Sequence, residues 1–152
     1  MKNTTLIILI LFLYSCGYSS IYKNQTSQNF KINIIEKKGN SEMNNLIKNE
    51  IKLYSVKNTT NIYNLKIDTD YKKEILTKNS AGIITDYKLS VTSIFRVDLK
   101  GVTKVIELKE TINIKNQSDS CEQNTYEKNI KRSFASSIRE KLISEILNLN
   151  DN

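Results

Sequence analysis

The chain has 152 residues, with 23 Lys and Arg against 16 Asp and Glu, so its formal net charge at pH 7 is +7. It contains no His and only two Cys. This excludes a disulfide-dense scaffold and leaves any acid–base catalysis near neutral pH to a carboxylate or Lys of altered pKa. A basic balance of this kind favours anionic partners but does not identify them.

Residues 1–15 predict a secretory signal peptide. Lys2 is followed by the continuous apolar run Leu6–Leu13, which is too short to cross a bilayer because a membrane-spanning helix needs about 20 residues. The run ends in Leu13-Tyr14-Ser15-Cys16, which resembles the lipobox of bacterial lipoproteins. That resemblance implies cleavage before Cys16, acylation of the Cys16 sulfur and new amino group, and attachment to a membrane. The alternative is an uncleaved N-terminal anchor in which Cys16 is buried.

Removing the signal leaves residues 16–152, enough for one domain. Residues 16–29 are polar and show no period, so we predict a flexible tether that follows the lipidated Cys16. One α+β domain is expected over residues 30–149. Gly17 lacks the acidic character that retains lipoproteins at the inner membrane of enteric bacteria, and the outer membrane is therefore the expected destination.

A strand and a helix are predicted first in this domain. Phe30, Ile32 and Ile34 alternate with polar residues, which is typical of a strand. Gly39-Asn40 interrupts the alternation, and Ser41 is expected to cap the helix that follows. Apolar residues then recur three and four positions apart on one helix face, at Met43, Leu46, Ile47, Ile51 and Tyr54.

Three long strands are predicted next, over Tyr63–Ile75, Ile83–Leu99 and Val102–Ile114. Apolar and polar residues alternate in each, which predicts an antiparallel meander with one apolar face and one charged face. The middle strand would run about 55 Å, longer than most strands of globular proteins. It must therefore bend, or project beyond its own domain. Phe95 is expected in the core on its apolar face.

A long helix is predicted from Ser120 to Leu149, where Ser120 and Gln123 match a capping box. The order of elements is then β-α-β-β-β-α. The predicted fold class is α+β, a four-stranded, mostly antiparallel sheet with two helices packed on one face.

The sequence lacks the patterns of catalytic and metal sites. It has no Cys pair, EF-hand loop or Gly-rich phosphate loop, so we expect no metal site and no cofactor. Asp68 and Asp70 share one strand face, but the lysines beside them favour solvated charges over an acid–base pair. Cys121 has no visible base next to it and is expected to be a half-buried residue at the start of a helix. We therefore expect a protein that is not an enzyme.

The order of elements also matches a known family. A lipobox followed by Cys16-Gly17-Tyr18, the β-α-β-β-β-α domain, and a last helix that opens Asn124-Thr125-Tyr126-Glu127 and carries Ala135 resemble the LPS-assembly lipoprotein (LptE) family of alphaproteobacterial type. The resemblance implies a lipid-anchored plug on the periplasmic side of the outer membrane, seated in the LptD β-barrel. Such a plug supports barrel assembly and takes part in lipopolysaccharide transport to the cell surface. It implies no nucleic-acid partner.

Basic residues at the ends of the predicted strands are candidate contacts to the phosphates of lipopolysaccharide. They form two groups, one near each hairpin turn: Lys72, Lys73 and Lys78, and Arg96, Lys100 and Lys104. The alternative interpretation of each group is ordinary solubilising charge.

Two other functions remain open at this point. One is a periplasmic interaction lipoprotein, for example a pilotin-like partner of another outer-membrane complex. The other is a carrier of a small apolar ligand between sheet and helices. A carrier needs an internal cavity, whereas tight packing by Phe95, Ile106, Phe134 and Ile138 would fill that space.

Overall fold

The computed structural model describes residues 30–54, 59, 61–99 and 101–150. The predicted signal peptide, Cys16, the tether and Lys100 lie outside the described residues. The elements are β1 (Phe30–Gly39), α2 (Ser41–Tyr54), β2 (Asn61–Lys78), β3 (Ile84–Leu99), β4 (Val102–Lys115) and α3 (Ser120–Asn150). The predicted order β-α-β-β-β-α is confirmed.

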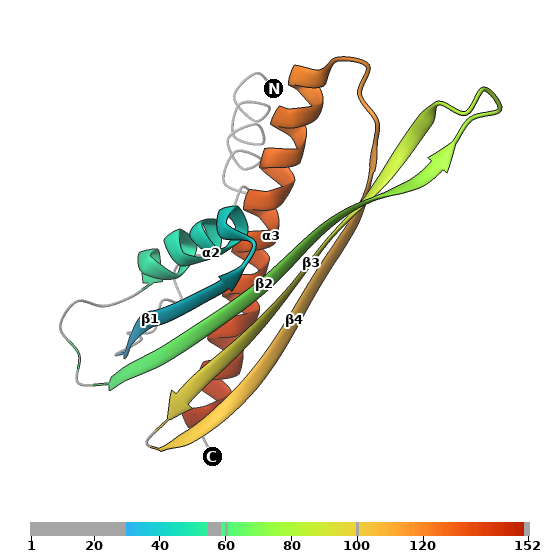
Figure 1. Cartoon of the computed structure of the whole chain (residues 1–152). Coiled ribbons are helices and arrows are strands. Elements are labelled where there is room, and N and C mark those ends of the chain that lie inside the picture. Colours follow the sequence, from blue (N-terminus) through green and yellow to red (C-terminus); the bar gives the residue numbers. More distant parts are fainter. Residues whose placement is uncertain (1–29, 55–58, 60, 100, 151–152) are drawn as a thin grey trace, which may run out of the picture.

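The four strands form one sheet in the order β1-β2-β3-β4. β1 pairs with β2 in parallel, and the other two pairs are antiparallel. A parallel pair needs a crossover connection, which α2 supplies between β1 and β2. Both helices lie on the same side of the sheet (Figure 1), as the predicted α+β class requires.

The chain turns sharply from β1 into α2 at Gly39, whose φ of 78° favours glycine. A Cβ atom at this position would lie 2.1 Å from the backbone oxygen of Thr69. The next amide, that of Asn40, donates a hydrogen bond of 2.6 Å to the same oxygen. The start of α2 is therefore held directly against β2.

The N-caps of both helices lie one residue earlier than the sequence predicts. The Asn40 side-chain oxygen accepts the amide of Met43 at 2.9 Å, so Asn40 and not Ser41 caps α2. The Asp119 carboxylate accepts the amides of Cys121 and Glu122, and it replaces Ser120 as the cap of α3. The prediction failed because Asn and Asp are caps as good as Ser and stand next to it in both places.

The meander is longer than its helical cover. β2 has 18 residues and β3 has 16. The β2–β3 hairpin runs past the helices and projects from the domain (Figure 1). Of the two options that the length of the predicted strand left open, projection is the one observed.

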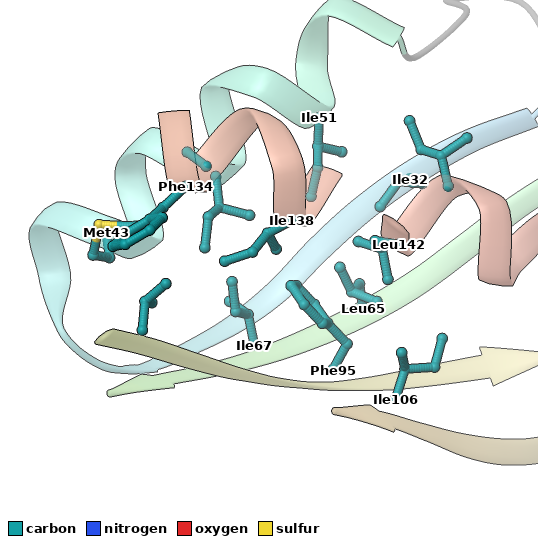
Figure 2. Close-up of a cluster of buried hydrophobic side chains, with 14 of the residues drawn as sticks. Ile32, Met43, Ile51, Leu65, Ile67, Phe95, Ile106, Phe134, Ile138 and Leu142 are labelled. Carbon is teal, nitrogen blue, oxygen red and sulfur yellow. The ribbon is translucent and has the colours of Figure 1, made fainter. Parts of the chain in front are cut away.

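The core lies between the helices and one face of the sheet. Figure 2 shows side chains of the sheet, such as Ile67 and Phe95, pointing toward Ile138 and other residues of the helices. The four side chains expected to fill the space of an apolar-ligand cavity are all buried: Phe95, Ile106, Phe134 and Ile138. This packing argues against a ligand cavity around these four side chains. A pocket of about 300 Å³ does lie between β1 and α2, lined by Ile32, Ile34 and Ile51 together with Lys31, Asn33, Lys48 and Lys52.

Candidate functional site

Neither of the two described helices covers the face of β2, β3 and β4 that points away from them (Figure 1). We call it the open face. Strand register and side-chain alternation define its members, and none of them is buried. They are Asn64, Lys66, Asp68, Asp70, Lys72 and Glu74 of β2, Lys88, Ser90, Thr92, Ile94, Arg96 and Asp98 of β3, and Thr103, Val105, Glu107, Lys109, Thr111, Asn113 and Lys115 of β4.

Basic and acidic side chains are interspersed on the open face. Lys72 and Asp70 form an ion pair of 3.2 Å, and Lys66 lies 3.6 Å from Glu36 of β1. A hydrogen bond from Lys38 and the charges of Lys38 and Lys66 lower the pKa of Glu36. A face with this chemistry suits a polar surrounding, because burying unpaired charges against an apolar surface is costly.

The six predicted basic residues do not form one site. Lys72 and Arg96 lie on the open face, whereas strand register places Lys73 and Lys104 on the side of the helices. Lys78 ends β2, and Lys100 is outside the described residues. Arg96 and Lys104 lie toward the opposite end of the sheet from the β2–β3 turn. A single phosphate therefore cannot contact both predicted groups of basic residues.

Lys73 already has partners within the fold. Its ammonium lies 2.8 Å from a carboxylate oxygen of Glu127 and 4.4 Å from the ring centre of Tyr87. Both contacts are intramolecular, so Lys73 already has partners within the fold, and its contact to a ligand stays a prediction.

Glu127 is the centre of a polar cluster between β2 and the helices. Its carboxylate accepts hydrogen bonds from Tyr71 at 2.9 Å and Lys73 at 2.8 Å, and Lys131 lies 3.5 Å away. Lys131 also forms a 2.8 Å ion pair with Glu42 of α2. We call these five residues, Tyr71, Lys73, Glu127, Lys131 and Glu42, the Glu127 cluster.

The cluster shifts two pKa values in opposite directions. Burial raises the pKa of Glu127, but the hydrogen bonds from Lys73 and Tyr71 and the nearby positive charges outweigh it, so the net pKa is lowered. Burial, together with the contact to Glu127, raises the pKa of Tyr71. The arrangement therefore holds an ionised Glu127 and a neutral Tyr71. Sequence reasoning missed this cluster, although the i,i+4 spacing of Glu127 and Lys131 is a signal for part of it.

Cys121 is exposed, so the prediction that it is half-buried was wrong. It lines an open groove of about 530 Å³ at the start of α3, beside Asp119 and Tyr126. The Asp119 carboxylate accepts hydrogen bonds from the backbone amides of Cys121 and Glu122, so these amides already have an acceptor.

Over the residues that the structure describes, no group of three potential metal ligands occurs. Neither α2 nor α3 combines the length and the apolar content of a membrane-spanning helix.

No protein-family model matches the sequence, and no curated protein matches it either. Solved structures do match its fold. The crystal structure of rare lipoprotein B from Shewanella oneidensis superposes with a TM-score of 0.57 at 17% identity, over 78% of this chain and 99% of that one. A minor lipoprotein from Acinetobacter baumannii matches with a TM-score of 0.50 at 13% identity, over 76% and 93% of the two chains. At these identities the likeness establishes a common fold.

Proposed function

We propose that this chain is an outer-membrane lipoprotein of the LPS-assembly type. It is anchored through an acylated Cys16, lies on the periplasmic side, and sits inside the LptD β-barrel. There it supports barrel assembly and takes part in lipopolysaccharide transport. The observation that carries the proposal is the open face, a long polar sheet surface that neither α2 nor α3 covers.

The chemistry of the open face agrees with a barrel lumen. The interior of outer-membrane barrels is polar, whereas their outward band is apolar. Interspersed Lys, Asp, Thr and Asn side chains can exchange water for hydrogen bonds with such a lumen at little cost. The likeness of the fold to a solved rare lipoprotein B supports the same proposal.

Exposed basic residues remain the candidates for lipopolysaccharide contacts. Lys72, Lys78, Arg96 and Lys104 are exposed, and a Lys or Arg forms a charge-assisted hydrogen bond with a phosphate. Arg96 is the strongest of them, because it lies on the open face and no carboxylate of the described chain is within ion-pair distance of it.

The first test addresses the anchor. Mass spectrometry of the mature protein should show a new N-terminus at Cys16 with attached acyl chains, and a Cys16→Ser variant should remain an unprocessed precursor. A mature protein that begins elsewhere, or that carries no lipid, would contradict the proposal.

The second test addresses the partner and the activity. Capture of the acylated protein from detergent extracts should recover a large β-barrel in a 1:1 complex, and depletion should reduce the lipopolysaccharide that reaches the cell surface. A different dominant partner, with surface lipopolysaccharide unchanged, would favour the pilotin-like alternative.

A further inference from the structure

The projecting end of the β2–β3 hairpin carries exposed apolar side chains. Ile75, Leu76 and Ile83 are 52%, 45% and 61% exposed. We call residues 75–84 the hairpin tip. Strand register is irregular on either side of Thr77, which interrupts the alternation of faces and leaves the neighbours Ile75 and Leu76 both about half exposed. Three large aliphatic side chains at the end of a projection are costly to leave in water, at up to about 1.5–3 kcal/mol each.

The turn at the tip satisfies its own backbone. The amide of Asn79 donates to the carbonyl of Ile83 at 2.9 Å, and the amide of Gly82 donates to the carbonyl of Asn79 at 2.9 Å. The Asn79 side-chain oxygen accepts the amides of Ala81 and Ile83. Four amide groups of the turn therefore have acceptors within it, which removes most of the cost of taking a backbone turn out of water.

Cations lie beside the apolar tip. Lys78 is exposed and Lys88 is half-buried, and neither has a carboxylate of the described residues within ion-pair distance. The nearby acidic residues are Glu74, which the strand register places opposite Lys88, and Asp86. The Asp86 carboxylate accepts hydrogen bonds from the side chains of Thr77 and Thr85, and these lower its pKa. A Lys near an anionic bilayer surface gains about 1 kcal/mol, so the two lysines would add to the insertion of the apolar side chains.

We propose that the hairpin tip inserts into the interfacial layer of an anionic phospholipid bilayer. Ile75, Leu76 and Ile83 enter the boundary between headgroups and acyl chains, and Lys78 and Lys88 contact lipid phosphates. The projection of the hairpin beyond the helices lets the tip reach a bilayer without steric contact from the domain (Figure 1). Lys88 is also a member of the open face, which we assign to the barrel partner, whereas the three apolar side chains and Lys78 are not.

The absence of Trp from the sequence provides a direct probe. An Ala81→Trp variant of the full chain carries a single Trp at the tip, and Glu107→Trp carries one on the open face as a control. Each is mixed with vesicles of phosphatidylethanolamine and phosphatidylglycerol, with or without bromine on the acyl chains. We expect a shift of the Ala81→Trp emission to shorter wavelength and quenching by the brominated lipid, and neither change for Glu107→Trp.

Two comparisons separate insertion of the tip from other causes. Replacing Ile75, Leu76 and Ile83 by Thr in the Ala81→Trp background keeps strand-forming residues but should reduce the quenching at position 81 severalfold, even where an acylated Cys16 still holds the chain on the vesicle. Quenching at position 81 should also be weaker in neutral phosphatidylcholine vesicles, because they offer no net negative charge to the lysines. Emission at position 81 that stays at its value in water, equal quenching at position 81 in neutral vesicles, or equal quenching at position 107 would each overturn the proposal. The first of these outcomes would indicate that the hairpin tip binds a partner protein and not a bilayer.

Discussion

Glu127 is a charged and largely buried residue that nevertheless stabilises the folded state. Its side chain is 14% exposed, and its carboxylate faces three groups: the hydroxyl of Tyr71 and the ammonium groups of Lys73 and Lys131. A hydrogen bond to a charged group contributes about 1.5–3 kcal/mol, which offsets the loss of hydration.

Glu127→Gln should therefore reduce the free energy of unfolding by about 1–3 kcal/mol at pH 7. The folded protein lowers the pKa of Glu127 below its ordinary value of 4.5. The stabilisation by the carboxylate is thus complete above pH 4.5 and is lost as the pH falls through the folded-state pKa. Urea unfolding from pH 7 to pH 3 should show the difference between wild type and variant narrowing below pH 4.5. A difference that stays constant would contradict this assignment, and the exposed Glu74→Gln is the control.

Phe95 and Arg96 are adjacent in sequence but point to opposite faces of the sheet. Phe95 is 0% exposed, so Phe95→Ala should lower the free energy of unfolding by roughly 3–5 kcal/mol, through lost burial and the cavity left behind. Arg96→Ala should change it by less than about 0.5 kcal/mol. Denaturant titration measures both values. A loss near zero for Phe95→Ala would mean that the faces of β3 are inverted.

At the scale of elements, polar contacts complement the apolar core in tying the helices to the sheet. The Glu127 cluster joins α3 to β2 and α2. On β4, Glu110 accepts a hydrogen bond from Ser137 and forms a 2.7 Å ion pair with Lys141, both of α3. These contacts lower the pKa of Glu110 despite its partial burial. The long helix is therefore held at two separate positions along its length.

The entry into α2 offers a test that separates backbone strain from steric contact. Gly39 and Gly82 have almost the same φ, 78° and 79°, but only Gly39 has an atom, the Thr69 oxygen, where a Cβ would be placed. Each Gly→Ala change should cost about 1–2 kcal/mol for the left-handed conformation. Gly39→Ala should cost clearly more, or prevent folding, because the backbone of β2 must also move. Circular dichroism and thermal unfolding measure this contrast, and equal losses would contradict it.

At the scale of the whole molecule, the two faces of the sheet differ in what covers them. The helix side forms the buried core, whereas in our proposal the open face contacts the lumen of a barrel. Charges on the open face contribute little to folding, because exposed side chains rarely change stability by more than about 0.5 kcal/mol.

Reversing two charges on the open face should therefore separate binding from folding. Arg96→Glu with Lys109→Glu should leave the thermal unfolding midpoint nearly unchanged and reduce the recovery of the barrel in capture experiments. Lys48→Glu with Lys52→Glu makes the same charge change on α2, away from the open face, and should leave recovery unchanged. Equal recovery with both double variants would show that the open face does not contact the barrel.

The sequence by itself determined the order of the elements and the two faces of the meander. The two-residue period of Ile83–Leu99 and the three- and four-residue spacing after Ser41 are local signals, set by the geometry of strands and helices. These local signals predict Phe95 in the core and Arg96 on the polar face without reference to any tertiary contact. The same signals did not determine the parallel pairing of β1 with β2.

Only the tertiary structure decided which polar residues are engaged and which are available. Lys73 and Lys78 look alike in the sequence, yet Lys73 pairs with Glu127, 54 residues away, while Lys78 stays exposed at the projecting tip. Contacts between distant residues depend on how the helices pack across the sheet, and no local periodicity encodes that packing. For the same reason, the exposure of Ile75, Leu76 and Ile83 depends on the tertiary arrangement, in which the β2–β3 hairpin runs away from the helices (Figure 1).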